Sequence, residues 1–453
     1  MKKVAKFGGS SVANANQIKK VVNIVKNDKE IKALVVSAPG KRFDKDIKVT
    51  DLLIQIYTEY INKSDQYLRT LKDILQRYED ICNDLKIDNS IIIEFENTIL
   101  SYFENIDDLF YLKNAILSCG ENFNAQIINL YLNSQNIKSK FLSPKEAGIT
   151  LINTMEQPII DEITYKNLNR FEDFNDILVV PGFFGYSQNN EILTFLRGGS
   201  DITGAIVARG INADIYENYT DQSYIYSADP NIIDSPKPVK NISFEEMREL
   251  SYNGFGIFQE DAVEPLLNTN INIQVKNTND PYIGGTVISA KRKDTDKNKI
   301  VGISCVDNMI SFNVTEYLLN RKSGYTNRLL DIFRYNHISI EHIPTGIDSI
   351  SVIFKEEQIK SKAHKETLIN NIKNTFNLDD LSVKEHLSSI AIVGSGINEN
   401  RVDILYEIIS ILKKEKINIE YLIQGASKTS IFIIVENKFS KKALSKLYES
   451  LFK

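Results

Sequence analysis

The stretch Lys6-Phe-Gly-Gly-Ser-Ser-Val12 follows directly on the apolar residues Val4 and Ala5. It reads as the end of a buried strand, a tight Gly-Gly turn and the start of a helix. Two glycines let backbone N–H groups approach an anion, a helix N-terminus adds partial positive charge, and Lys6 supplies a full one. The stretch fits neither GxxxxGK[ST] nor GxGxxG, so it indicates a different kind of phosphate site, with a plain turn as the alternative.

Short apolar runs alternate with helical patterns along the first 290 or so residues. Residues 4–7, 33–37 and 177–181 read as buried strands, whereas 17–27 and 204–210 show helical periodicity. Repeated strand–turn–helix units predict an α/β fold with a mainly parallel sheet covered on both faces. Residues 51–131 are mainly helical in pattern, with an interruption near 86–90. We interpret this stretch as packing helices without chemistry of their own.

A second glycine-rich turn, Phe195-Leu-Arg-Gly-Gly-Ser-Asp-Ile-Thr-Gly204, precedes a helix at 205–209. Arg197 can bind a carboxylate through two hydrogen bonds, which a lysine cannot do. Asp201 either serves chemistry at this turn or only complements the helix dipole. Ser118-Cys-Gly-Glu121 is expected to begin another helix, where a first-turn Glu is commonly a dipole partner.

Composition excludes several classes of protein. The net charge of −5 argues against a generally basic nucleic-acid surface. The three cysteines are far apart, and the four histidines lack metal-ligand spacing, so we expect neither a disulfide framework nor a protein-held metal. No long apolar segment suits a signal peptide or a membrane span, so we expect a cytoplasmic protein without membrane or nucleic-acid partners.

The last third of the chain contains an internal repeat. Ile338-Ser-Ile-Glu, Gly346 and the following Ser-Val-Ile-Phe match Ile417-Asn-Ile-Glu, Gly425 and Ser-Ile-Phe-Ile at a constant offset of 79 residues. Each copy reads as helix, strand, turn and strand, preceded by another strand. The charged residues 291–299 before the repeat are interpreted as a linker, or alternatively as a long solvated turn.

Taken together, these stretches resemble the aspartate kinases of the amino acid kinase family. The motifs are KFGGSSV at 6–12, VVSAPGKRF at 35–43, VTDLL at 49–53, GE at 120–121, RGGSD at 197–201, YENYTD at 216–221 and YSADP at 226–230. The repeat resembles the paired ACT domains of the same enzymes, through GIDSISV at 346–352 and INIEYLIQG at 417–425. The resemblance implies a three-layer α/β/α kinase domain at 1–290, followed by two α+β, ferredoxin-like ACT domains at 300–384 and 385–453, with interleaving as an option.

The resemblance also implies a role for each matching residue. ATP would be bound by Lys6, Phe7, Gly8, Gly9, Thr220, Asp221, Tyr226 and Asn231. Aspartate would be bound by Thr50, Glu121, Arg197, Gly198, Gly199 and Ser200, with Arg197 on the α-carboxylate and Glu121 near the ammonium. Lys6 and Asp201 would be catalytic: Lys6 neutralises the transferring phosphoryl group and Asp201 orients Lys6. The cofactors implied are ATP and nucleotide-bound Mg²⁺.

Two departures from the family pattern matter. Asn231 stands where the family often carries Arg, and Gly256 stands where many members have Lys in a Gly-Ala-Lys segment. A missing lysine removes a phosphate contact, for which Lys276 is a candidate replacement. These departures favour the main alternative, a non-catalytic amino-acid-sensing protein on a degenerate kinase domain. A kinase of another amino acid, such as glutamate, is the second alternative.

The implied reaction is phosphoryl transfer from ATP to the β-carboxylate of L-aspartate, the first step of lysine, threonine and methionine biosynthesis. A carboxylate needs no general base, which agrees with the absence of histidine before residue 337. Feedback by lysine or threonine, and a homodimer or homotetramer joined through ACT domains, are expected. The hypothetical effector site comprises Ser323, Gly324, Tyr325, Thr345, Asp348 and Ser349; ordinary turns are the alternative.

Overall fold

The computed structural model describes all residues except 155–156, 197, 255–259, 293–298, 379–380 and 453. The chain forms two compact units. The first comprises Met1–Ile225, Pro238–Arg248 and Gly256–Arg292, and the second comprises Tyr226–Lys237, Glu249–Phe255 and Lys293–Lys453. The predicted linker at 291–299 falls largely outside the described residues.

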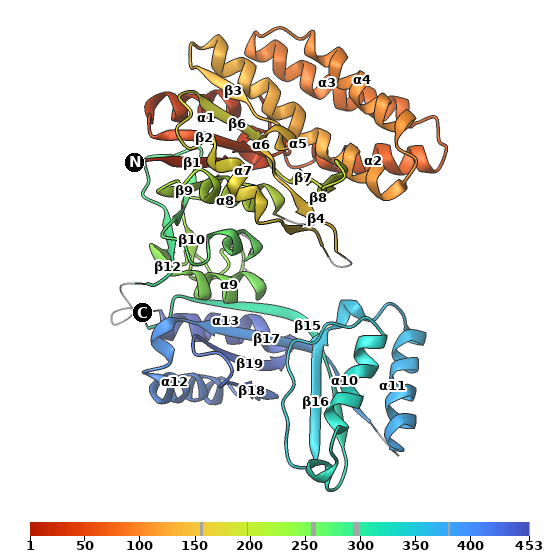
Figure 1. Ribbon diagram of the computed structural model, residues 1–453. Helices are drawn as coiled ribbons and strands as arrows, with labels where there is room; N and C mark the ends of the chain where they lie inside the picture. The colour runs from red at the N-terminus through yellow and green to blue at the C-terminus, as the bar shows by residue number, and fades with distance from the viewer. Residues whose placement is uncertain (155–156, 197, 255–259, 293–298, 379–380, 453) are drawn as a thin grey trace. The chain divides into compact units, whose positions relative to one another are not determined.

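The first unit contains an eight-stranded sheet in the order β12-β14-β13-β9-β1-β2-β6-β3 (Figure 1). Its strands are β1 Lys3–Phe7, β2 Ile31–Val36, β3 Ser139–Phe141, β6 Ile177–Pro181, β9 Ile215–Thr220, β12 Asn241–Ser243, β13 Asn272–Asn277 and β14 Thr286–Ser289. The central pairs, from β3 to β13, are parallel, and β13 pairs with β14 antiparallel. The mainly parallel sheet predicted from the apolar runs is therefore confirmed.

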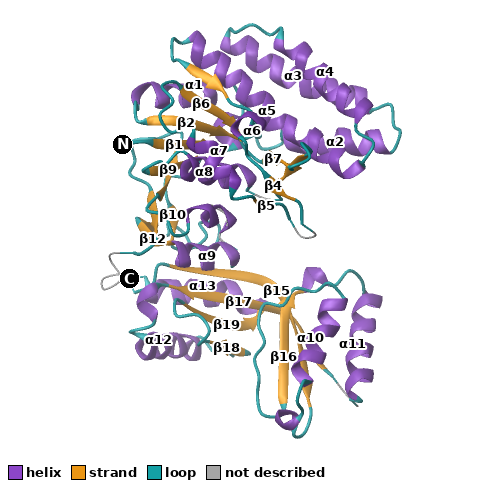
Figure 2. Cartoon of the chain, viewed as in Figure 1, coloured by secondary structure: helices purple, strands orange, loops and turns teal. Residues whose placement is uncertain are grey.

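Helices cover both faces of this sheet (Figure 2). They are α1 Ala15–Asn27, α2 Val49–Ile61, α3 Tyr67–Leu85, α4 Ile91–Asn105, α5 Leu109–Ser134, α6 Pro144–Ala147, α7 Ile163–Asn169, α8 Gly199–Gly210 and α9 Phe244–Tyr252. Apolar side chains of α1 to α5 share one core with β1 and β2, whereas α8 packs against β1, β2 and β9. In α3, apolar residues recur every three or four positions, so their side chains lie on one face of the helix and form its buried stripe. The three-layer α/β/α class is confirmed.

Short elements complete the first unit, and one of them, β10, has its second residue in the second unit. They are the 3₁₀ turns η1 Gly9–Val12 and η2 Glu260–Leu266, and the two-stranded pairs β4 Leu151–Ile152 with β5 Ile159–Ile160, β7 Phe184–Tyr186 with β8 Ile192–Thr194, and β10 Ile225–Tyr226 with β11 Pro238–Val239. The break expected near 86–90 separates α3 from α4, where Lys86 adopts a left-handed conformation with φ 59°. Helix α1 begins at Asn14, whose side chain accepts a hydrogen bond from the Gln17 N–H.

The second unit contains a five-stranded antiparallel sheet in the order β16-β15-β17-β19-β18. Its elements are β15 Gly302–Thr315, η3 Leu319–Arg321, α10 Tyr325–Tyr335, β16 Ser349–Lys355, η4 Glu356–Gln358, α11 Lys362–Phe376, β17 Ser382–Val393, η5 Ser395–Ile397, α12 Arg401–Lys414, β18 Tyr421–Ile423, β19 Ser430–Glu436 and α13 Asn437–Leu451. Helices α10 and α11 contribute to one core, and α12 and α13 to a second. The two sequence repeats thus each form a helix-covered part of one sheet.

The two repeats differ in one expected strand. In the second copy this segment forms β18, which pairs with β19. In the first copy only isolated bridges form, from His342 to Ile353 and from Thr345 to Ile350. Pro344 lies between these bridges, and a proline has no N–H to donate to a ladder. The prediction of a continuous strand in the first copy was therefore wrong.

Candidate active site

A cavity of about 740 Å³ opens in the first unit at the carboxyl ends of β1, β2 and β9. In parallel α/β sheets, ligands bind at this edge because loops and helix N-termini converge there. The lining residues are Lys6, Gly9, Ser10, Ser37, Ala38, Pro39, Gly40, Lys41, Arg42, Phe43, Asp44, Lys48, Thr50, Glu121, Phe183, Gly198, Gly199, Ser200, Asp201 and Asp221. Both glycine-rich turns singled out in the sequence therefore contribute to one cavity.

The first glycine-rich turn is held tightly against the loop that follows β2. Gly8 N–H donates to the Tyr219 carbonyl at 3.1 Å, and Gly40 N–H donates to the Gly9 carbonyl at 2.9 Å. A Cβ added at Gly40 would lie 2.7 Å from the Gly9 carbonyl carbon, so only glycine fits there. Gly9 lines the cavity, whereas Phe7 is fully buried and stacks on Tyr219 with ring centroids 4.7 Å apart. Any contact of Phe7 with a ligand must therefore use its backbone.

Lys6 and Asp201 form the charged centre of the cavity. Lys6 is only 7% exposed, and its Nζ lies 2.5 Å from Asp201 Oδ1. Asn218 Nδ2 donates to the same Oδ1 at 2.7 Å, and the Tyr216 hydroxyl donates to the Asp201 backbone carbonyl at 3.0 Å. These bonds fix the carboxylate, which in turn fixes the lysine. The pairing inferred from the resemblance is present in the geometry.

Asp201 lies in the first turn of α8, which begins directly after the second glycine pair. Gly198 has φ 61°, a left-handed conformation that favours glycine. A Cβ at Gly199 would lie 2.7 Å from Cδ2 of Phe183, so the close packing of this turn also requires glycine. The first N–H groups of a helix lack intrahelical partners and attract anions. Arg197, predicted to bind a carboxylate, lies outside the described residues.

Glu121 lies in the interior of α5, so the prediction that Ser118-Cys-Gly-Glu121 begins a helix was wrong. The helix begins instead after Asp108, whose side chain accepts hydrogen bonds from the Phe110 and Tyr111 N–H groups. Gly120 permits close contact with the loop after β2, because a Cβ there would lie 2.8 Å from the Ala38 Cβ.

The carboxyl group of Glu121 is buried at the cavity wall. The residue is 4% exposed, and Oε2 has no hydrogen-bond partner among the described residues. Burial raises the pKa of Glu121 to about 8, against the lowering effects of the Ala38 backbone N–H and the Lys6 charge. A buried carboxyl with an unused oxygen is suited to receive a cationic group that enters the cavity.

Thr50, predicted to bind the substrate, lines the cavity. The remaining predicted nucleotide residues are divided between the units. Asp221 lines the cavity, and Thr220 donates from its hydroxyl to Asp221 Oδ1 at 3.1 Å. Tyr226 and Asn231 belong to the second unit. Asn231 is exposed, and its backbone and side-chain N–H groups both donate to Asp229 within a turn.

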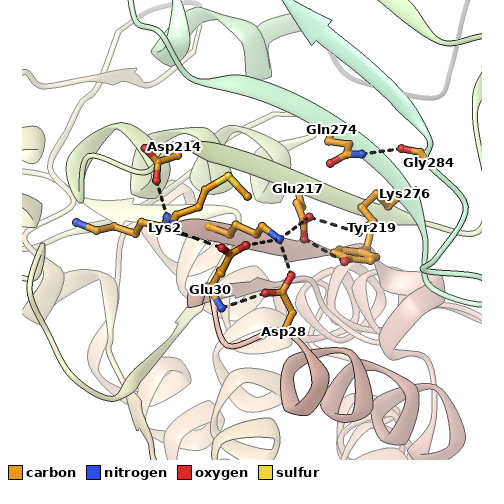
Figure 3. A network of polar contacts seen from close by, with 11 residues as sticks. Lys2, Asp28, Glu30, Asp214, Glu217, Tyr219, Gln274, Lys276 and Gly284 are labelled. Carbon is orange, nitrogen blue, oxygen red and sulfur yellow. Dashed lines mark hydrogen bonds and ion pairs between the residues drawn. The ribbon is translucent and has the colours of Figure 1, made fainter.

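Lys276 does not lie in the cavity. It follows Val275 on β13, and Val275 is in register with Asn218, so Lys276 occupies the face of the sheet opposite to Lys6. Its Nζ lies 3.3 Å from Oε1 of the buried Glu217, as Figure 3 shows. Lys276 is thus engaged in a separate polar network with Tyr219 and Lys3. The hypothesis that Lys276 replaces the missing phosphate contact of Gly256 is not supported, and Gly256 itself lies outside the described residues.

The motif at 35–43 contains Lys41 and Arg42, but the sequence analysis assigned no role to the cationic residues of the loop after β2. Lys41, Arg42 and Lys48 all line the cavity together with Lys6. The available signal was the pair of basic residues directly after Gly40, at the end of a buried strand. Among the described residues, no cluster of three or more His, Cys, Asp or Glu side chains could hold a metal ion. No described helix combines the length and apolar character required to span a membrane.

The residues of the hypothetical effector site lie in the second unit. Gly324 has φ 75° and precedes α10, whose first residue, Tyr325, is buried. Asp348, in the loop before β16, accepts two hydrogen bonds at 2.8 Å: its carbonyl from Glu316 N–H and its Oδ1 from Leu318 N–H. The loop before β16 therefore lies against the segment that joins β15 to η3, a few residues before Ser323 in the chain.

Comparison with known proteins agrees with this architecture. The sequence profile of the amino acid kinase family matches residues 1–277, and that of the ACT domain matches residues 390–451. Aspartokinase 3 of Bacillus subtilis is 36% identical over 452 residues, which cover 99% of this chain and 98% of the relative. The crystal structure of Clostridium acetobutylicum aspartate kinase, described as an allosteric enzyme, has a TM-score of 0.89 at 34% identity and full coverage of both chains. E. coli aspartokinase III in complex with aspartate and ADP has a TM-score of 0.79 at 21% identity, with full coverage of both, a likeness of fold.

Proposed function

The chain belongs to the amino acid kinase family and, within it, to the aspartate kinases, and from this premise we propose its reaction and the roles of its residues. It transfers the γ-phosphoryl group of ATP to the β-carboxylate of L-aspartate and releases 4-phospho-L-aspartate and ADP. The observation that carries this proposal is the joint presence of Lys6, Asp201 and Glu121 in one cavity. Lys6 is a fixed cation that suits a transferring phosphoryl group. The unpaired buried carboxyl group of Glu121 suits the ammonium group of a substrate.

In this proposal the aspartate substrate lies between α5 and the start of α8. Its ammonium group approaches Glu121, whose free oxygen then gains a charged partner, and its α-carboxylate is bound by Arg197. Thr50, Gly198, Gly199 and Ser200 supply the remaining wall, with first-turn N–H groups of α8 directed at negative charge. An unpaired buried carboxyl is costly, and an ammonium group that ionises it would recover that cost on binding.

The chemical step is an in-line displacement. A β-carboxylate oxygen forms a bond to the γ-phosphorus while the bond between this phosphorus and the β,γ-bridging oxygen breaks, and ADP leaves. No proton is transferred, so no general base is required. Lys6, held by Asp201, neutralises the charge on the transferring group, and the backbone of Gly8 and Gly9 borders the phosphates.

Nucleotide binding is assigned to Lys6, Phe7, Gly8, Gly9, Thr220, Asp221, Tyr226 and Asn231. Mg²⁺ would accompany ATP and shield its phosphates. The cations Lys41, Arg42 and Lys48 are additional candidates for phosphate contact, given the departures at Asn231 and Gly256.

The second unit is proposed to be regulatory. Two ACT domains at 300–384 and 385–453 would follow a catalytic domain at 1–290. Because β15 and β17 each contribute residues to both cores of the second unit, the two ACT domains would be interleaved. Lysine or threonine would bind near Ser323, Gly324, Tyr325, Thr345, Asp348 and Ser349, between subunits of a homodimer or homotetramer. The enzyme would act in the cytoplasm at the first step of lysine, threonine and methionine biosynthesis.

A substrate panel tests the proposed reaction. Purified protein is incubated with Mg·ATP and either L-aspartate, L-glutamate or no acceptor, and ADP release is followed with a coupled assay. We expect ADP formation that depends on aspartate. ADP formation with glutamate alone would reassign the acceptor, and failure to bind nucleotide would favour the sensor alternative.

A further inference from the structure

Arg77 of α3 lies behind the active-site cavity and bonds to three acceptors in two separate segments. It is 4% exposed and does not line the cavity. Its Nη1 donates to Asp46 Oδ2 at 2.6 Å, and its Nη2 donates to the carbonyls of Gly40 at 2.6 Å and Ala13 at 3.3 Å. Ala13 directly follows η1, the turn that contains the first glycine pair. One guanidinium therefore bonds to both loops that border the cavity.

Asp46 closes the second of these loops upon itself. Besides the bond from Arg77, its carboxylate accepts bonds from the Arg42 backbone N–H at 2.8 Å and from Arg42 Nε and Nη2 at 2.9 Å. The Arg42 bonds, with the Arg77 guanidinium, hold the pKa of Asp46 well below its usual range, so the carboxylate is charged throughout the physiological range. The buried cation and anion thus neutralise each other, while Arg77 Nε has no hydrogen-bond partner among the described residues.

The loop fixed in this way supplies much of the cavity wall. Six consecutive residues, from Pro39 to Asp44, line the cavity, as do Lys48 and Thr50. Gly40 is the contact point with the first glycine-rich turn, through its N–H bond to the Gly9 carbonyl. The carbonyl of the same Gly40 accepts from Arg77, so a displacement of the guanidinium would act directly on the junction of the two loops.

We propose that Arg77 and Asp46 are positioning residues that lock the loop of residues 39–48 and the first glycine-rich turn into the geometry required for phosphoryl transfer. This inference rests on the proposed function. The three acceptors diverge around a planar guanidinium, which explains why arginine occupies this position: a lysine ammonium beside Asp46 lacks the fork needed to reach both carbonyls. Neither residue lines the cavity, so neither is assigned a contact with substrate.

The test compares steady-state kinetics of Arg77→Ala, Arg77→Lys and Asp46→Asn with the wild-type enzyme. A misplacement of about 1 Å in a catalytic site costs on the order of 10²-fold in rate, so we expect about that loss in kcat/KM for Arg77→Ala. We expect a higher KM for aspartate together with a lower kcat, because the loop lines the cavity in which both aspartate and the transferring phosphoryl group are proposed to bind. Arg77→Lys should lie between Arg77→Ala and the wild type.

A second buried ion pair in the same unit provides the matched control. Arg292 Nε lies 3.1 Å from Glu246 Oε1, with side chains 1% and 0% exposed, and neither residue lines the cavity. Arg292→Ala should lower the melting temperature, as Arg77→Ala does, but leave kcat and KM near their wild-type values. A merely structural role for Arg77 would make the two variants alike in kinetics.

Chemical rescue gives an independent readout. Arg77 also lines a small cavity of about 240 Å³ with Asn14, Asp80 and Asp84, through which a free guanidinium ion can enter once the side chain is removed. Guanidinium chloride at concentrations far below those that unfold proteins should restore part of the activity of Arg77→Ala, whereas sodium chloride at the same ionic strength should not.

The outcomes separate this inference from the proposed function. An inactive wild-type protein would overturn both. An active wild type with wild-type kinetics in Arg77→Ala, or with equal kinetic losses in Arg292→Ala and no guanidinium rescue, would overturn the positioning role alone. If Arg77→Ala does not fold, Arg77→Lys and Asp46→Asn decide: wild-type kcat/KM in both would refute the inference.

Discussion

Replacement of Glu121 by glutamine should stabilise the protein at high pH while it disables substrate binding. The pKa of Glu121 is raised to about 8 by burial, from 4.5 for an ordinary glutamate. Between these values the folded protein keeps the proton that the unfolded chain releases. The free energy of unfolding of the wild type therefore falls as the pH rises from 4.5 to 8, by about 1.4 kcal/mol per pH unit and by about 5 kcal/mol over the window. Glutamine has the same shape and does not ionise, so Glu121→Gln escapes this loss.

Thermal melts of the ligand-free protein at a series of pH values measure this effect. The difference in melting temperature between Glu121→Gln and the wild type should grow by roughly 2–3 °C per pH unit between pH 5 and 8, for a unit of this size. Use of the difference cancels the other titrating groups, which the two proteins share. A difference that stays constant with pH would refute the raised pKa and the reasoning built on burial.

The same variant tests the ligand of Glu121. An aspartate ammonium that binds beside the carboxyl group must ionise it, so the wild type should release close to one proton on binding aspartate near neutral pH. Calorimetry in buffers of different ionisation enthalpy measures this release. Glu121→Gln should release none and should lose about 10²-fold or more in kcat/KM for aspartate, since one partner of a buried charge pair is missing. Unchanged proton release in the variant would place the ammonium elsewhere.

Three further predictions follow from the geometry of the site. Lys6→Ala should lower kcat by about 10²–10³-fold, and a near-wild-type kcat would remove Lys6 from the catalytic set. Gly120→Ala should lower kcat/KM because the new Cβ would lie 2.8 Å from the Ala38 Cβ, whereas Gly284→Ala, with nothing within 4 Å, is the control and should be neutral. Lysine or threonine, singly or together, should lower the rate or raise the melting temperature, and Asp348→Ala, which removes the acceptor of Leu318 N–H, should weaken this response; no response to either amino acid would contradict the effector site.

The parts of the fold that produce a local pattern of residues, such as buried strands and repeats, could be predicted from the sequence. The strands around Val4, Val35 and Val179 are mainly apolar, and each is a buried strand of the parallel sheet. Parallel strands end at a common edge, which is why Lys6 and Asp201 meet although 195 residues separate them. The constant offset between the repeats likewise predicted two related parts of the second unit.

The contacts that set the chemistry of the site were harder to predict. The raised pKa of Glu121 results from its burial, and the tight packing of Gly120 against Ala38 is likewise a long-range contact; no periodicity in the sequence reveals either. Arg77 lies on the buried face of α3, where apolar residues were expected. Its bonds to Asp46 and Gly40 connect this helix with a loop more than thirty residues earlier in the chain. In the first repeat, Pro344 interrupts the segment that forms a strand in the second repeat, although the two sequence patterns match.

The most direct test of the central claim is to trap the product of the reaction. The protein is incubated with Mg·ATP, L-aspartate and hydroxylamine, which converts an acyl phosphate into a hydroxamate, with Lys6→Ala and L-glutamate as controls. The proposed mechanism predicts aspartyl hydroxamate and ADP in equal amounts from the wild type with aspartate, and almost none in either control. ADP release from aspartate and ATP without hydroxamate, or equal hydroxamate from Lys6→Ala, would contradict transfer to the β-carboxylate at this site.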